Sequence, residues 1–293
     1  MIGFDYLGKL GQLGNQMFQY AAGRNLSISL DTEIKLDITS YNNDVKREYE
    51  LKHFRIKDIH ANESEIASWR MPEIFHDRYR KRILWYLPFT YPKHFREKEI
   101  DFDSRFFNIQ NNCYVEGYFQ SKKYFLNSES ILRKEFLKKN TEFENKHFLS
   151  EIDSKKESVS IHIRRGDYIS DKKINNIFFV CDLNYYQNAI NYINDKIKNP
   201  TYFVFSDDLD WARDNLNFLS DVVYIDYKDK SNSSSVEEII LMSKCKNHII
   251  SNSSFSWWGT WLCQKNDQIN ISPKKWDNTK TDKSDLIENF INL

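Results

Sequence analysis

Two consecutive arginines follow a strand-like segment and could bind a phosphorylated ligand. In the run HIRRGD (162–167), Arg164 and Arg165 come at the end of the alternating segment 158–163. Arginine donates bidentately to phosphate and keeps its proton, so it can stabilise a diphosphate leaving group as the bond to it breaks. Asp167 could hold one arginine in place or take part in proton transfer. Surface salt bridges after a strand would explain the same residues equally well.

Two carboxylates follow another apolar segment. Asp207 and Asp208 come after YFVFS (202–206), and carboxylates at strand ends commonly accept hydrogen bonds from ribose hydroxyls or from guanine. Two other interpretations stay open. Asp208 and Asp210 form a DxD pair, which can hold a divalent metal on a diphosphate. Either Asp207 or Asp208 could instead cap the helix expected over 209–216.

Small hydroxyl residues precede a tryptophan-rich segment in SNSSFSWWG (251–259). Hydroxyl groups and backbone N–H groups at a helix N-terminus bind anions, so Ser253 and Ser254 are candidate phosphate ligands. An ordinary helix cap would use the same residues. For Trp257 and Trp258 we expect core packing.

A glycine-spaced turn, GQLGNQ (11–16), lies between a strand expected over 2–7 and a helix. Its spacing is not GxGxxG, which disfavours an NAD site. Glycines let the backbone approach a ligand or turn tightly, and structure alone could explain them. Asn15 and Gln16 are expected to direct their amide groups into a cleft between two domains.

In the second half of the chain, strand patterns alternate with helix patterns. This alternation predicts a parallel sheet with helical crossovers, in which ligands lie at the carboxyl ends of the strands. The polar groups described above in this half all follow such strands. The expected strands are 158–163, 202–206, 222–226 and 248–251, with helices over 186–197 and 236–245.

The length and composition favour two α/β domains without nucleic-acid binding. The 293 residues include 42 basic and 42 acidic side chains, whereas nucleic-acid binding usually needs a basic face. The polar stretch 138–158 predicts domains at 1–149 and 150–293, with the final helix packing back on the first. Four scattered cysteines without a CxxC pair indicate buried thiols in a reducing compartment. No signal peptide or membrane span is evident, which predicts a soluble, cytoplasmic protein.

Five segments, in this order, resemble those of the bacterial α-1,2-fucosyltransferases of the glycosyltransferase family 11 type. Because they extend from the first turn to near the end of the chain, the resemblance covers almost all of it. The matching segments are GQLGNQMFQYAAG (11–23), EGYFQSKKYF (116–125), HIRRGDY (162–168), FSDDLDW (205–211) and SNSSFSWWGTWL (251–262).

The resemblance implies an α/β GT-B fold, with two Rossmann-like domains facing a central cleft. It also implies inverting transfer of L-fucose from GDP-β-L-fucose to O2 of a terminal galactose, in surface polysaccharide or O-antigen synthesis. Neither a metal nor a cofactor is expected, and GDP-fucose and a galactose-terminated glycan are the expected partners. A lipid-linked acceptor would allow peripheral membrane contact, for which ILWYLPF (83–89) is a candidate segment.

The resemblance also assigns roles to residues. By this resemblance Arg164 would face the donor phosphates. From the residues themselves, Asp167 is the second candidate catalytic residue, and it is expected to position Arg164 rather than to act as the base. Gln12 departs from the family pattern, which usually has a glycine there. Asp167, Glu116 and Asp171 are candidate general bases. The expected donor-binding residues are Gly14, Asn15, Gln16, His162, Arg165, Asp207, Asp208, Asn252, Ser253, Ser254 and Phe255.

Within this group the resemblance places His162 on the guanosine and Asp207 on the nucleoside. It places Ser253, Ser254 and Phe255 on the β-phosphate, whereas Gly14 and Asn15 would close over the donor from the first domain.

Two alternatives to this function stay open. One is a metal-dependent glycosyltransferase that uses Asp208 and Asp210. The other is a non-catalytic protein that binds a nucleotide sugar or a glycan, since 15% of the residues are aromatic and aromatic rings stack on sugars. Four aromatic residues could form a sugar platform, although core packing explains them equally well: Trp69, Trp85, Tyr86 and Tyr91.

Overall fold

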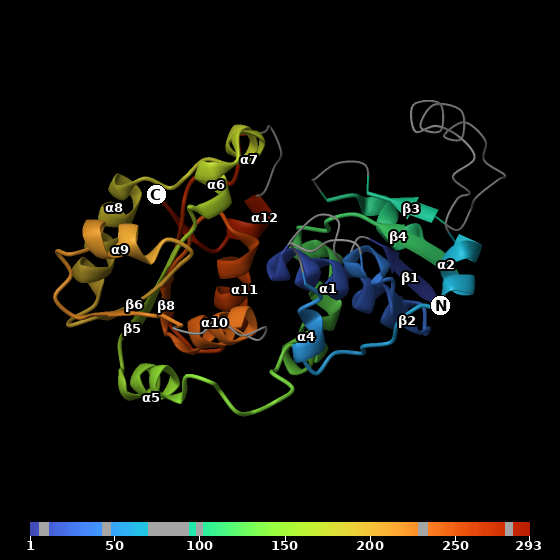
Figure 1. Cartoon of the computed structure of the whole chain (residues 1–293), viewed down its shortest axis with the longest axis horizontal. Coiled ribbons are helices and arrows are strands. Elements are labelled where there is room, and N and C mark those ends of the chain that lie inside the picture. Colours follow the sequence, from blue (N-terminus) through green and yellow to red (C-terminus); the bar gives the residue numbers. More distant parts are fainter. Residues whose placement is uncertain (6–11, 43–47, 70–93, 98–101, 228–233, 279–283) are drawn as a thin grey trace. The chain divides into compact units, whose positions relative to one another are not determined.

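The computed structural model divides the chain into two compact units, Met1–Phe136 and Leu137–Leu293. It describes residues 1–5, 12–42, 48–69, 94–97, 102–227, 234–278 and 284–293 (Figure 1). Each unit is built on a sheet whose described strand pairs are all parallel. The parallel α/β class expected from the sequence is confirmed.

The first unit opens with a strand, a turn and a long helix, as the sequence predicted. Helix α1 (Leu13–Ser29) connects the neighbouring strands β1 (Ile2–Asp5) and β2 (Ile34–Leu36) and is buried along most of its length. Gly23 lets this helix approach β1, because a Cβ atom there would come within 2.3 Å of the Phe4 ring. The strands lie in the order β2 (Ile34–Leu36), β1 (Ile2–Asp5), β4 (Cys113–Glu116) and β3 (His94–Arg96).

Short helices connect the other parts of this unit, as expected, but the strands β2, β3 and β4 were not predicted. Trp69 is buried and its ring stacks on Tyr114 at 5.8 Å, so this tryptophan belongs to the core and not to a sugar platform. Trp85, Tyr86, Tyr91 and 83–89 lie outside the described residues. The short helices are η1 (Thr39–Asn42), η2 (Leu51–His53), α2 (Glu63–Trp69), η4 (Ser104–Asn108), η5 (Lys122–Tyr124), η6 (Leu126–Ser128) and α4 (Glu129–Glu135).

The second unit contains a six-stranded sheet in which β5 is central. All six residues of β5 are buried, including the polar Ser160 and His162, because helices cover both faces of the sheet. Figure 1 shows α8 (Leu183–Lys196) and α9 (Leu209–Asn215) on one face and α10 (Ser234–Lys244) and α11 (Ser254–Leu262) on the other. The strands lie in the order β10 (Ile291–Asn292), β9 (Asn270–Ser272), β8 (Asn247–Ile249), β5 (Ser158–Ile163), β6 (Thr201–Ser206) and β7 (Val222–Tyr224).

The strands and helices predicted for the second half are confirmed, with small shifts at their ends. In α8, the carboxylate of Asp182 caps the helix by accepting from Tyr185 N at 2.9 Å, and an apolar stripe faces the sheet. The helices are α5 (Lys146–Ser154), α6 (Gly166–Ser170), α7 (Lys172–Ile177), α8 (Leu183–Lys196), α9 (Leu209–Asn215), α10 (Ser234–Lys244), α11 (Ser254–Leu262) and α12 (Ser284–Ile287).

The division between the units falls before Leu137, whereas the polar stretch predicted it at 149/150. A buried ion pair explains the difference: Lys138 lies in the stretch, yet its ammonium group pairs with Glu237 of α10. The polar composition of the 138–158 stretch therefore does not mean that all of it is a solvent-exposed linker. The end of the chain also belongs to the second unit, since Trp257 Nε1 donates to the carbonyl of Leu286 at 2.8 Å.

The expectation of buried free thiols is confirmed, because all four cysteines are free and buried. Burial raises the pKa of Cys113 to about 11 and that of Cys181 to about 12, so both thiols stay protonated at neutral pH. Among the described helices, none combines the length and the apolar character needed to cross a membrane.

The Lys138–Glu237 pair predicts a specific stability change. In Lys138→Met, the fully buried carboxylate of Glu237 loses its counter-charge, which is expected to lower the free energy of unfolding by roughly 3–5 kcal/mol. The double variant Lys138→Met/Glu237→Gln should regain much of this loss. Urea unfolding measures both changes.

The matched control is Arg213→Met, since Arg213 pairs with Asp226 at the surface and its loss should cost less than about 1 kcal/mol. A double variant as unstable as Lys138→Met would contradict the interpretation.

Candidate active site

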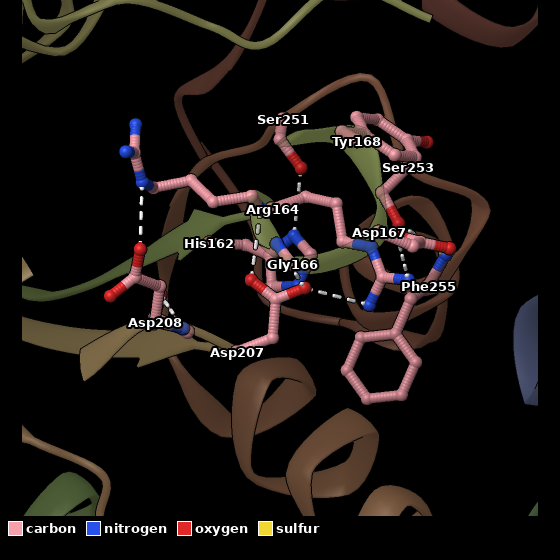
Figure 2. Close-up of polar contacts among 12 residues, drawn as sticks. His162, Arg164, Gly166, Asp167, Tyr168, Asp207, Asp208, Ser251, Ser253 and Phe255 are labelled. Carbon is pink, nitrogen blue, oxygen red and sulfur yellow. Dashed lines mark hydrogen bonds and ion pairs between the residues drawn. The ribbon is translucent and has the colours of Figure 1, made fainter. Parts of the chain in front are cut away.

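The polar groups of the second unit gather at the carboxyl edge of its sheet because β5, β6 and β8 are neighbours in it. In the register of the parallel pair β5–β6, Ile163 lies opposite Ser206, so the two strands end side by side. Strand β8 pairs with the other side of β5. The three segments singled out in this half of the sequence therefore form one site, as predicted (Figure 2).

Arg164 is held between two carboxylates. Its Nη2 donates to Asp167 Oδ1 at 2.6 Å, and its Nη1 lies 3.0 Å from Asp207 Oδ2. The guanidinium carbon lies 5.6 Å from the centre of the Tyr168 ring. Figure 2 shows the Arg164 side chain extending toward Asp167 and Phe255. These contacts orient Arg164, and Asp167 therefore acts in this structure as one of its positioning partners.

Arg165 has other partners. Its Nε donates to Asp208 Oδ2 at 3.0 Å, and its guanidinium carbon lies 4.1 Å from the centre of the Trp211 ring, which favours a cation–π contact. Asp208 also caps α9, since its Oδ1 accepts from Trp211 N at 3.2 Å. The capping interpretation of Asp208 is confirmed. The two arginines were predicted together but are bound to separate carboxylates.

The two carboxylates of the DxD sequence also lie in separate surroundings. Asp208 is bound to Arg165 and to the start of α9, whereas the Asp210 side chain is 98% exposed and lies 3.5 Å from Arg213. Nor does any group of three or more metal-binding side chains occur in the described part of the chain. The geometry therefore offers no support for a metal site at Asp208 and Asp210.

His162 is buried beneath this edge. Its Nδ1 is hydrogen-bonded to Ser251 Oγ at 2.9 Å, its carbonyl accepts from Tyr186 OH at 3.2 Å, and its ring lies 5.5 Å from that of Phe255. Burial, and to a lesser degree the charge of Arg164, lowers the pKa of His162 to about 3. The imidazole is therefore neutral at physiological pH and supports its neighbours rather than transferring protons.

Asn252 was predicted to bind the donor substrate, but its amide group bonds to other groups of the protein. Its Nδ2 donates to the carbonyls of Phe179 at 3.0 Å and Trp276 at 2.9 Å, and its Oδ1 lies 3.6 Å from the thiol of Cys181. Its own carbonyl accepts from Tyr168 OH at 3.2 Å. Asn252 therefore ties the site to the loops around it.

Helix α11 begins directly after Asn252 and Ser253. Ser253 is its N-cap, with its hydroxyl accepting from Phe255 N at 3.3 Å, and Ser254 is partly exposed at the first turn. This arrangement suits both capping and anion binding at a helix N-terminus. Trp257 and Trp258 are buried with ring centres 5.0 Å apart, which confirms their predicted place in the core.

The residues of the first unit that were predicted to contact the donor substrate bond mostly to other groups of the protein. Gln16 is buried: its Nε2 donates to Glu48 O at 2.9 Å and its Oε1 accepts from Glu50 N at 3.1 Å. It therefore holds the 48–50 segment. Asn15 Oδ1 accepts from Gln120 Nε2 at 2.7 Å, which joins the first two matching sequence segments. Gly14, also a predicted contact, lies buried inside the first turn of α1.

The unusual Gln12 causes no strain. It is the N-cap of α1, with φ −79° and ψ −174°, an extended conformation that any residue adopts. A glycine is therefore not needed at this position. Of the proposed bases, Glu116 is buried and pairs with His94 at 2.9 Å and with Arg96, and Asp171 is exposed at the end of α6.

Two residues of the site were missed by the sequence analysis, although both lie within its matching segments. Tyr168 OH donates to Asn252 O and the Tyr168 ring lies against the Arg164 guanidinium, whereas the Arg165 guanidinium lies over the Trp211 ring. Aromatic residues directly after charged ones were the available signal.

The fold is the α/β GT-B fold. Among solved structures, a FUT1 variant of Arabidopsis thaliana in complex with GDP has a TM-score of 0.54 at 10% identity. The match covers 95% of this chain and 71% of that one, and it shows the shared fold. The sequence profile of glycosyl transferase family 11 matches residues 8–291, and the chain belongs to this family.

Two relatives from Escherichia coli are similar over most of their length. An α-1,2-colitosyltransferase is 35% identical over 274 residues, which is 91% of this chain and 90% of the relative. The O-antigen biosynthesis glycosyltransferase WbnK is 30% identical over 318 residues, covering 97% and 98%. The chain is therefore a glycosyltransferase and not a non-catalytic binding protein, and its relatives include transferases of more than one description.

The pKa of His162 predicts how stability depends on pH. Because the pKa is about 3 in the folded protein and about 6.5 when exposed, the unfolded chain binds a proton between these values that the folded chain does not. The contribution of His162 to stability is thus fully present above about pH 6.5 and is lost as the pH falls toward 3.

In this window the loss per pH unit is about 1.4 kcal/mol. The variant His162→Gln should therefore show a shallower decrease in the free energy of unfolding between pH 6.5 and pH 4 than the wild type, as measured by urea unfolding. Equal slopes would contradict the assignment.

Proposed function

We propose that the protein transfers L-fucose from GDP-β-L-fucose to O2 of a terminal galactose, with inversion to an α-1,2 linkage and without a metal ion. The expected setting is O-antigen or other surface polysaccharide synthesis, as the name of the WbnK relative suggests. The observation that carries the proposal is the oriented guanidinium of Arg164 at the strand edge beside the start of α11.

Arg164 is the proposed electrostatic catalyst. Breaking the bond between the sugar and GDP leaves negative charge on the β-phosphate while the sugar gains oxocarbenium character. The contacts to Asp167 and Asp207 use two of the five N–H donors of Arg164. Others can donate to the departing phosphate, and Ser253, Ser254 and Phe255 at the start of α11 can add hydroxyl and backbone donors.

The acceptor hydroxyl attacks the sugar carbon from the face opposite the departing GDP. A loosely bonded transition state needs little help from a base. Asp167, in contact with Arg164 and 38% exposed at its side chain, is proposed as a positioning residue rather than as that base. Glu116 is already paired with His94 and with Arg96, which also disfavours it.

The donor sugar is the point on which the known relatives leave a choice, since one of them is named as a colitosyltransferase. The fucosyl assignment is supported by the five ordered sequence segments. We expect wild-type protein to transfer fucose from GDP-fucose to β-galactosides, with NMR showing the new linkage at O2, and full activity in excess EDTA. Preference for GDP-colitose in competition would reassign the donor, and loss of activity in EDTA would favour the metal-dependent alternative.

Replacing Arg164 tests the mechanism. Arg164→Lys keeps the charge but removes the planar fork, so kcat should fall by roughly 100-fold or more. Arg213→Lys is the matched control, because Arg213 lies in the same unit in an exposed pair with Asp226 and should keep wild-type activity. A steady-state assay with GDP-fucose measures both, and near-normal turnover of Arg164→Lys would overturn the mechanism.

A further inference from the structure

Asp207, the residue after β6, lies beside the turn that follows β5. Its Oδ1 accepts from Arg165 N at 2.8 Å and its Oδ2 accepts from Gly166 N at 3.1 Å. The same Oδ2 lies 3.0 Å from Arg164 Nη1. One carboxylate thus binds two successive backbone N–H groups and the guanidinium that precedes them.

Gly166 makes room for this carboxylate. A Cβ atom at position 166 would come within 2.8 Å of Asp207 Oδ2 and within 3.3 Å of its carboxyl carbon. The absence of a side chain at position 166 and the presence of a short carboxylate at position 207 therefore depend on each other. A longer residue at either position would separate the turn from the end of β6.

The neighbouring Asp208 serves the other arginine. It binds Arg165 Nε and the N-terminus of α9, and Trp211 lies against the face of that guanidinium. Arg165 is therefore an anchor between β5 and α9. Of the two guanidinium groups, Asp207 contacts that of Arg164, whereas it binds Arg165 only through the backbone N–H group.

We propose that Asp207 is a positioning residue, which fixes the 164–166 turn and the plane of the Arg164 guanidinium rather than binding the nucleoside. For its kinetic consequence this inference rests on the proposed function. Charge-assisted bonds to two backbone N–H groups are stronger than neutral ones. Small displacements of a catalytic group lower turnover strongly, because the reacting geometry must be met in the transition state.

A split between kcat and KM separates the two roles of Asp207. In Asp207→Asn the amide cannot accept both backbone N–H bonds, so kcat should fall roughly 10- to 100-fold, while the KM for GDP-fucose and the Kd of GMP change by less than about 3-fold. A nucleoside ligand would instead weaken GMP binding, and that result would overturn the inference. Asp226→Asn, which removes a surface carboxylate paired with Arg213, is the matched control.

Coupling to Arg164 gives a second test. If Asp207 acts through Arg164, adding Asp207→Asn to Arg164→Lys should lower kcat by less than about 2-fold further. Multiplicative losses in the double variant would show an independent role. Gly166→Ala, which crowds the carboxylate, should lower kcat in the wild-type background but hardly in Asp207→Ala.

Amide hydrogen exchange tests the contact without any assay of transfer. The N–H groups of Arg165 and Gly166 should be protected in the wild type and exchange markedly faster in Asp207→Ala, measured by NMR at equal thermal stability of the two proteins. Unchanged exchange would overturn the inference whatever the reaction is. If Asp207→Ala shows the expected faster exchange but the wild-type protein transfers no fucose, the inference stands and the proposed function alone is overturned.

Discussion

The register between β5 and β6 is the constraint on which the site depends. Because Ile163 lies opposite Ser206, the residues that follow the two strands face each other in order. Arg164 thereby reaches Asp207, and Arg165 reaches Asp208. A shift of one residue would exchange these partners and move each side chain to the other face of its strand.

The site is organised before a ligand arrives. Two guanidinium groups are matched by three carboxylates, those of Asp167, Asp207 and Asp208. An anionic ligand must therefore compete with carboxylates for Arg164. In return, the arginine is already ordered, so binding does not have to restrict its side chain, whose rotamer entropy corresponds to about 2 kcal/mol. Preorganised donors are what electrostatic catalysis requires, since they need no rearrangement as charge develops.

Much of this arrangement could be predicted from the sequence. Strands of alternating or continuous apolar residues placed the polar segments at one edge of a parallel sheet. The short strands β2, β3 and β4, with three or four residues each, carry too little periodicity to be recognised. The division of the units was also displaced, because Lys138 finds its counter-charge in a distant helix.

The partners of the polar side chains were less predictable than their positions. The amides of Gln16 and Asn252 looked like ligand groups, yet each bonds to backbone groups of segments remote in sequence. Such contacts exist only after folding, so residue type and spacing cannot reveal them. The two arginines were likewise predicted to bind phosphate together, although the Arg165 guanidinium bonds to Asp208 and lies against the Trp211 ring.

The hydrogen bond between Asn15 and Gln120 joins two parts of the first unit that are 105 residues apart in sequence. Together with the bond from Gln19 Nε2 to Gly117 O at 3.0 Å, it fastens the start of α1 to the segment that follows β4. The residues between these contacts include the rest of α1 and the strands β2 and β3. The start of α1 therefore cannot shift along the sheet without breaking bonds to the 117–120 segment, so the two segments keep each other in place although the chain joins them only through most of the unit.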